Sequence, residues 1–181
     1  IVPAADLGII DDIMARVRGH KLAWPLLYEQ GRVIEPSLFW ESHGVQCKSR
    51  PDMITSAGIV DIKTTRSLND RSFTRDCITY GYDISLAAAQ EAYDFIGGQH
   101  YNATICAICT EPPYAIAVRP VDVDVMALGK RRWNELLASY AACMKSGVWP
   151  GPADDKEWPL VLPAWAQAQV DDVITLGGER L

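Results

Sequence analysis

The sequence predicts an α/β domain with a central mixed β-sheet that is covered by helices on both faces. Apolar residues recur with helical spacing in several segments, strand-like runs separate these segments, and glycine or proline marks many boundaries. The 181 residues, 49% of them hydrophobic, suffice to bury a sizeable core. The resulting order of a helix, three strands, two helices, two strands and a helix fits this class.

The first half of the chain is expected to hold one helical segment and three strands. Residues from about 6 to 30 are expected to be helical, with Asp6 as the N-cap and with bends or breaks at Gly19 and Pro25. One apolar stripe is formed by Leu7, Ile10, Met14 and Val17. The expected strands lie near 36–41, 45–54 and 59–65. The last two flank a short turn at Ser56 and Ala57.

The second half is expected to begin with two helices, over 67–80 and 83–96, and glycines at 97 and 98 end the second. Strands near 102–110 and 114–119 follow, joined by a proline-rich turn, and precede a helix over 122–145. We therefore predict one domain. Its parts are an N-terminal helical segment (1–30), a core (31–146) and an irregular C-terminal tail (147–181).

The turn at Ser56 and Ala57 lies at the most informative part of the chain. In a hairpin centred there, positions whose numbers sum to 113 face each other, so Asp52 lies opposite Asp61. Like charges in such a pair destabilise a sheet, and a cation between them would relieve the repulsion. Because side chains alternate along a strand, Lys63 shares a face with Asp61. The pattern predicts a divalent metal with an ammonium beside it.

These residue types suit metal-dependent hydrolysis of a phosphodiester. Carboxylate oxygens are preferred ligands of Mg²⁺ and Mn²⁺, and the backbone carbonyl of Ile62 is a further candidate ligand. Lys63 would hold or deprotonate the attacking water and stabilise charge on the phosphate. Asp52, Asp61 and Lys63 are therefore the candidate catalytic residues. On spacing alone, a solvated hairpin with an ordinary Asp61–Lys63 ion pair is an equal alternative.

The segment from Arg50 to Lys63 resembles the Pro-Asp…Asp-x-Lys motif of the PD-(D/E)XK nuclease superfamily. Other runs are similar, in order and spacing, to its RecE-like branch of the exonuclease VIII type: Pro36-Ser37-Leu38-Phe39-Trp40, Cys47-Lys48-Ser49, Asp61-Ile62-Lys63-Thr64-Thr65 and Tyr80-Gly81-Tyr82-Asp83-Ile84. The resemblance implies a restriction-endonuclease-like core with a central mixed β-sheet flanked by helices. It also implies Mg²⁺ or Mn²⁺ as the cofactor.

The same resemblance implies a 5′ to 3′ exonuclease that degrades linear double-stranded DNA and leaves 3′ single-strand tails for recombination, in a phage or prophage setting. A RecT-like annealing protein would be the partner, and the enzyme would form a homo-oligomeric ring. Two alternatives stay open. One is an endonuclease or repair nuclease of the superfamily, and the other is an inactive nuclease-like domain that only binds nucleic acid.

Some positions depart from the RecE-like pattern, which has a glutamine and, four residues later, a tyrosine on the helix after the core strands. Ser85 and Ala89 stand at those positions. Gln90 and Tyr93 are candidate supporting residues, although Gln90 lies about 140° from Ser85 around a helix. Glu35 resembles an acidic position near the metals of related nucleases and is a further candidate ligand.

The family also has a metal-binding histidine on an early helix. His20 falls on a later segment and is instead expected to be an exposed or capping histidine. Because the chain starts with Ile1 and that early helix is missing, we expect a fragment that begins inside the domain and is one ligand short.

The net charge of −6 argues against a protein that coats DNA. Residues 48–76, however, hold six basic and four acidic side chains, a net charge of +2, so the hairpin lies in a locally basic zone. The candidate DNA-contacting residues are Arg50, Thr64, Arg66, Arg71 and Arg75. The alternative is that the last three arginines simply lie on a solvated helix with Asp70 and Asp76.

Five irregularly spaced cysteines favour a reducing compartment, and we expect a cytoplasmic protein. No apolar run approaches the ~20 residues of a membrane span, and no signal peptide is evident. Cys106 and Cys109 fall in an expected strand, where residues three apart face opposite sides. We therefore expect core cysteines and not a zinc site.

Overall fold

The computed structural model describes residues 3–97, 102–151, 154, 157, 159–163 and 166. The chain divides into two units, Ile1–Lys145 and Ser146–Leu181. Most of the predicted C-terminal tail lies outside the described residues, as does Gly98. Among the helices that are described, none has the length and apolar character needed to cross a bilayer.

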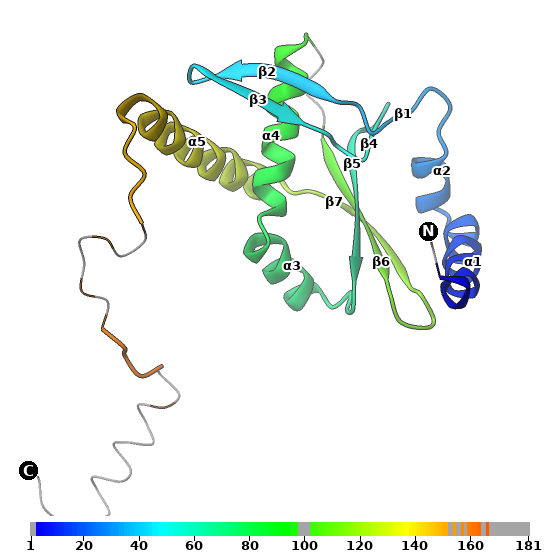
Figure 1. Ribbon diagram of the computed structural model, residues 1–181. Coiled ribbons are helices and arrows are strands. Elements are labelled where there is room, and N and C mark those ends of the chain that lie inside the picture. Colours follow the sequence, from blue (N-terminus) through cyan, green and yellow to red (C-terminus); the bar gives the residue numbers. More distant parts are fainter. Residues whose placement is uncertain are drawn as a thin grey trace, which may run out of the picture. The chain divides into compact units, whose positions relative to one another are not determined.

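A five-stranded mixed sheet forms the centre of the first unit, in the order β1-β4-β5-β6-β7 (Figure 1). Its strands are β1 (Val33–Ile34), β4 (Met53–Thr55), β5 (Gly58–Thr65), β6 (Ala103–Cys109) and β7 (Ile116–Pro120). Strands β5 and β6 are parallel, and the other neighbours are antiparallel. A parallel pair needs a crossover connection, which α3 (Asp70–Thr79) and α4 (Tyr82–Phe95) provide. The predicted mixed α/β class is confirmed.

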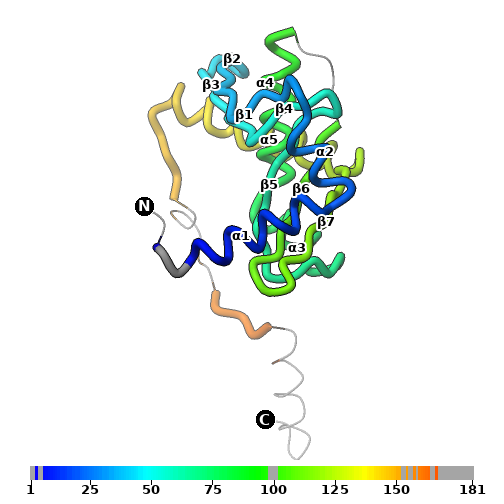
Figure 2. The backbone as a smooth tube through the Cα atoms, turned by 90° about the vertical axis from the view of Figure 1, so that its right-hand side faces the viewer, coloured from blue at the N-terminus to red at the C-terminus, as the bar shows by residue number. Residues whose placement is uncertain are grey.

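Both faces of the two parallel strands are buried. On one face, Ile59 and Ile105 pack with residues of α3 and α4. On the other face, Val60 and Cys106 pack with residues of α1 (Ala4–Gly19) and α2 (Ala23–Leu27). The two views show α3 and α4 on one side of the sheet and α1 and α2 on the other (Figures 1 and 2). Strands buried on both faces become almost wholly apolar, as β6 is.

A second, two-stranded sheet covers α4. It consists of β2 (Leu38–Ser42) and β3 (Val45–Ser49), and its apolar face packs on α4 and on α5 (Val123–Ser146). The prediction of one continuous strand over 45–54 is wrong. The chain leaves β3 at Ser49 and joins the main sheet only at Met53, and Pro51, which lacks an N–H donor, lies in the gap.

The N-terminal helical segment is divided at His20. Its ring Nδ1 accepts hydrogen bonds from the N–H groups of Leu22 and Ala23, at 3.3 and 3.1 Å, so the predicted capping role is confirmed. The prediction of Asp6 as the N-cap is wrong, because α1 begins at Ala4 and Asp6 lies within its first turn. Gly97, with φ of 80°, follows the end of α4 as expected.

The two cysteines of β6 face opposite sides, as predicted. Cys106 is fully buried among the residues that pack on α1 and α2, and this burial raises the pKa of its thiol to about 11. Cys109 Sγ instead donates to the backbone carbonyl of Arg66 at 3.5 Å. A thiol with so high a pKa stays protonated near neutrality in the metal-free protein.

A buried ion pair joins α4 to α5. The Asp83 side chain is fully buried, and Arg132 Nη1 donates to its two carboxylate oxygens at 2.9 and 2.8 Å. The same nitrogen donates to the carbonyl of Ile78 at 3.1 Å. Next to this pair the helices nearly touch, because a Cβ atom on Gly129 would lie 2.2 Å from the Asp83 carbonyl oxygen. The ion pair therefore fixes α4 to α5. The close contact at Gly129 leaves the two helices no room to move nearer to each other.

We predict that Arg132→Met lowers the free energy of unfolding by about 3–5 kcal/mol, because it leaves the buried Asp83 carboxylate without a partner. Urea unfolding measures the change. Arg131→Met is the matched control: its side chain is 69% exposed and pairs only loosely with Glu135, at 4.0 Å. We expect a change within about 0.5 kcal/mol for that variant. Similar losses in both variants would contradict a special role for the buried pair.

Candidate active site

The β4–β5 hairpin has the predicted register. Met53 pairs with Val60, Ile54 with Ile59 and Thr55 with Gly58. Gly58 has a φ of 125°, a conformation that other residues rarely adopt, so this glycine lets the chain enter β5 directly after the turn. Continuing the register by one residue puts Asp52 opposite Asp61.

Asp52 extends the hairpin with its side chain. Its Oδ2 accepts a hydrogen bond of 2.7 Å from the N–H of Ile62, and its backbone carbonyl accepts one of 2.9 Å from the N–H of Glu35. Hydrogen bonds to an ionised group are short and strong, so the first of these holds the carboxylate against β5. Because the N–H and C=O of a strand residue point to the same edge, the Ile62 carbonyl also lies on the Asp52 side of β5.

Asp61 is buried, with 8% of its surface exposed. Burial raises the pKa of its carboxyl group, Lys63 opposes that shift, and the charge of Asp52 adds to it. Lys63 Nζ lies 2.5 Å from Asp61 Oδ2. Apart from this ion pair, Oδ2 has no hydrogen-bond partner among the described residues. Burial of this carboxylate next to Asp52 is costly even with Lys63 beside it, and a bound cation would lower that cost.

Lys63 is held between Asp61 and an aromatic ring. Its Nζ lies 4.9 Å from the ring centroid of Tyr82, within the range of a cation–π contact. Tyr82 is the first residue of α4 and was not predicted as part of the site. Helical spacing could have indicated it, because Tyr82, Ser85 and Ala89 lie three and four residues apart, along one side of the helix.

A cleft of about 250 Å³ lies beside Asp61, between α4 and the chain that joins β3 to β4. Ser85 and Ala89 line it. Gln90 and Tyr93 do not belong to the described lining. Gln90 donates to Asp94 at 2.7 Å in a separate cavity, and Tyr93 packs with the residues beneath the β2–β3 sheet. The positions that depart from the RecE-like pattern therefore share the cleft with Asp61, whereas Gln90 and Tyr93 lie elsewhere.

The other candidate residues lie around the site at different distances. Arg50 lines the cleft, and its guanidinium lies 3.6 Å from the Glu35 carboxylate, with both side chains more than half exposed. Thr64, Arg66 and Arg75 line a second cavity beyond Lys63, whereas Arg71 is exposed at the start of α3. Within the described ranges, no three His, Cys, Asp or Glu side chains are grouped to hold a metal. Glu35 as a ligand thus stays a prediction.

The residues present fit a Mg²⁺ or Mn²⁺ ion of the kind that acts with a phosphate substrate. Such an ion commonly takes one or two protein carboxylates and completes its coordination with water and phosphate oxygens. Asp52 and Asp61 would hold it, with the Ile62 carbonyl on the same edge. The observation that favours this assignment is the buried Asp61 carboxylate opposite Asp52, because the charge of Asp52 raises the pKa of Asp61 and a cation would relieve that repulsion.

The fold, the paired carboxylates and the adjacent lysine define a nuclease-type domain. A family model matches residues 4–158, and the chain belongs to that family, DUF3799, described as a PDDEXK-like domain of unknown function. The predicted membership of the PD-(D/E)XK class is thereby confirmed. The comparison with curated proteins gives no match.

One solved structure shows the same fold. The crystal structure of a protein from Eubacterium rectale named "Putative exonuclease" superposes with a TM-score of 0.66 at 18% identity, over 97% of this chain. The match covers 67% of the Eubacterium rectale chain. A second structure, that of SSO0001, has a TM-score of 0.39 at 19% identity over 80% of this chain and 62% of its own, too low to carry an argument.

We predict that Asp61→Asn melts at a higher temperature than the wild type when both are measured near neutral pH with EDTA. The raised pKa of Asp61 means that the folded state disfavours the charged carboxylate. This cost to stability is fully present well above that pKa, and it disappears in acid, where the carboxyl group is neutral. The gain should be about 2–4 °C for each kcal/mol recovered. Thermal melts at neutral and acid pH measure it.

The same melts test metal binding. Mn²⁺ should raise the melting temperature of the wild type and of Asp11→Asn, an exposed control on α1, and should not raise that of Asp61→Asn. An equal rise in all three proteins would contradict the site.

Proposed function

We propose that this protein is a metal-dependent deoxyribonuclease that hydrolyses phosphodiester bonds at Asp52, Asp61 and Lys63. One observation carries the proposal. The hairpin register and the Asp52–Ile62 hydrogen bond hold two carboxylates at neighbouring positions, with the Lys63 ammonium 2.5 Å from one of them. In an ordinary surface ion pair both side chains are exposed, whereas Asp61 is buried.

Each group has a distinct role in this mechanism. The metal, when bound, supplies a Lewis acid that polarises the phosphate and lowers the pKa of a coordinated water. Asp52, which precedes β4, and Asp61, which lies on β5, would bind and orient it. Lys63, as an ammonium, holds the attacking water and stabilises charge that develops on the phosphate, and its partial burial strengthens this effect.

We further propose that the enzyme is an exonuclease that degrades linear double-stranded DNA from 5′ to 3′. Support comes from the ordered resemblance to RecE-like enzymes and from the shared fold of the Eubacterium rectale protein. The 3′ tails left behind would serve a RecT-like annealing protein in recombination, and a homo-oligomeric ring around the DNA would make degradation processive.

End-labelled linear duplex and closed circular plasmid, incubated with Mn²⁺, test the exonuclease proposal. We expect release of nucleotides from 5′-labelled ends and no loss of the closed circles. Digestion of closed circles would instead indicate an endonuclease of the same superfamily, and release from 3′ ends would reverse the proposed polarity.

A second candidate function is a nuclease-like domain that binds nucleic acid without cleaving it. The observation that favours it is the presence of Ser85 and Ala89 in the cleft, where the RecE-like pattern has glutamine and tyrosine. Calorimetry separates the candidates: a wild-type chain that binds DNA but not Mn²⁺ supports this second function.

We predict that Lys63→Ala retains Mn²⁺ binding and loses about 10²–10³-fold in turnover, because the lysine acts on water and phosphate and not on the ion. Calorimetry and a cleavage assay measure the two properties separately. Lys21→Ala, which removes an exposed lysine next to α2, should leave both unchanged. Unchanged turnover in Lys63→Ala would mean that the role of this lysine is misassigned.

A further inference from the structure

A second cavity, of about 690 Å³, begins where the candidate active site ends. Side chains at alternate positions of β5 share a face, so Asp61, Lys63 and Thr65 follow one another along it, about 7 Å apart. Asp61 lines the first cleft, and Thr65 lines the second cavity. Tyr82 connects the candidate active site to the second cavity, because its ring contacts Lys63 and Tyr82 also lines that cavity. We call this second cavity the β5–α3 groove.

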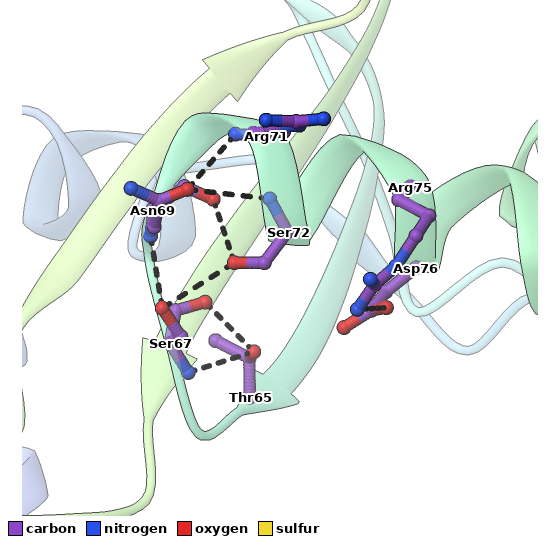
Figure 3. Close-up of polar contacts among 7 residues, drawn as sticks. All are labelled: Thr65, Ser67, Asn69, Arg71, Ser72, Arg75 and Asp76. Carbon is purple, nitrogen blue, oxygen red and sulfur yellow. Dashed lines mark hydrogen bonds and ion pairs between the residues drawn. The ribbon is translucent and has the colours of Figure 1, made fainter. Parts of the chain in front are cut away.

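The segment from β5 into α3, which supplies Thr65, Ser67 and Ser72 to the groove, is ordered by its own hydrogen bonds (Figure 3). Thr65 Oγ1 donates to the carbonyl of Ser67 at 2.9 Å, and Ser72 Oγ donates to Ser67 Oγ at 3.4 Å. Asn69 Oδ1 caps α3 by accepting from the N–H groups of Arg71 and Ser72, at 3.1 and 3.3 Å. A surface that is already ordered loses little conformational entropy when a ligand binds.

Among the described residues, the charged side chains that line the groove are two exposed arginines, Arg66 and Arg75, and one aspartate, Asp76, so positive charge is in excess. Arg75 pairs with Asp76 at 3.4 Å, but its side chain is 75% exposed, and such surface pairs contribute little (Figure 3). A phosphate can therefore compete for this guanidinium, since planar Arg donors bind phosphate well.

The groove also presents an exposed aromatic side chain. Tyr80, which follows α3, is 68% exposed, and its ring centroid lies 6.1 Å from that of Tyr82. A basic groove with exposed aromatic faces is the arrangement that binds single-stranded nucleic acid, with phosphates on the cations and bases stacked on the rings. Bases inside a duplex already stack on each other and do not offer a free face.

We propose that the β5–α3 groove binds a single-stranded end of the DNA substrate, with a base stacked on Tyr80 and neighbouring phosphates on Arg66 and Arg75. This inference rests on the proposed nuclease function and narrows its substrate. The strand to be cut reaches Lys63 unpaired, and Tyr80 positions the nucleotide next to the scissile phosphate.

Fluorescence anisotropy with a labelled single-stranded oligonucleotide in EDTA, where the site is without metal, tests binding apart from cleavage. Tyr80→Ala should weaken binding about 5- to 150-fold, the effect of losing one stacked base. Tyr80→Phe keeps the ring and should bind like the wild type. Phe95→Ala, the matched control, removes another exposed aromatic ring at the end of α4 and should have no effect.

An oligonucleotide with an abasic site at the stacking position tests the contact itself. The wild type should bind it as weakly as Tyr80→Ala binds the intact oligonucleotide, and Tyr80→Ala should lose nothing more. The inference is overturned if Tyr80→Ala binds the intact oligonucleotide as tightly as the wild type does. It is also overturned if Tyr80→Ala weakens binding to a blunt duplex by the same factor.

Failure of the inference and failure of the proposed function give different results. A wild type that degrades DNA with Mn²⁺ while Tyr80→Ala binds single strands normally overturns the groove assignment alone. A wild type that neither binds nor degrades DNA overturns both.

Discussion

The site depends on one hydrogen bond, from the N–H of Ile62 to the carboxylate of Asp52. Backbone pairing between β4 and β5 ends at Met53 and Val60, close to Pro51, which has no N–H to donate. The Asp52 side chain supplies the next acceptor and so continues the pairing by one step. Without this bond, the carboxylate would lie at a strand end exposed to water, and no second acid would be fixed beside Asp61.

Asp61 differs from Asp52. The sheet fixes its position directly, but burial of its charged carboxylate is unfavourable. Strand β5 pairs with β4 on one edge and with β6 on the other, and core residues cover both of its faces. Helix α4 closes the cleft beside it, and the buried ion pair of Asp83 with Arg132 holds that helix on α5. Burial favours the protonated form of Asp61. The packing energy of the surrounding core offsets the cost of keeping the charged carboxylate in this position.

The sequence was sufficient for those features that depend on local periodicity. The two-residue turn and the alternation of side chains predicted the hairpin register, the shared face of Asp61 and Lys63, and the opposite directions of Cys106 and Cys109. The resemblance added the class of domain. The break at Pro51 was missed because the residues on both sides of it read as strand, although they belong to different sheets.

Features that depend on contacts between distant segments were harder to predict. Tyr82 lies 19 positions after Lys63 and reaches it only because α3 turns the chain back toward β5. The salt bridge from Arg50 to Glu35 joins residues 15 positions apart, and Glu35 has a φ of 46°; no pattern in the sequence signals either feature. The helical wheel did separate Gln90 from Ser85, and in the structure the two side chains line different cavities.

The central claim is that Asp52 and Asp61 together bind a divalent metal. Crystals soaked in MnCl₂ and measured at the manganese absorption edge test it most directly. We expect an anomalous difference peak between the two carboxylates, in the wild type and not in Asp61→Asn. A peak that persists in Asp61→Asn, or manganese bound only elsewhere on the molecule, would contradict it.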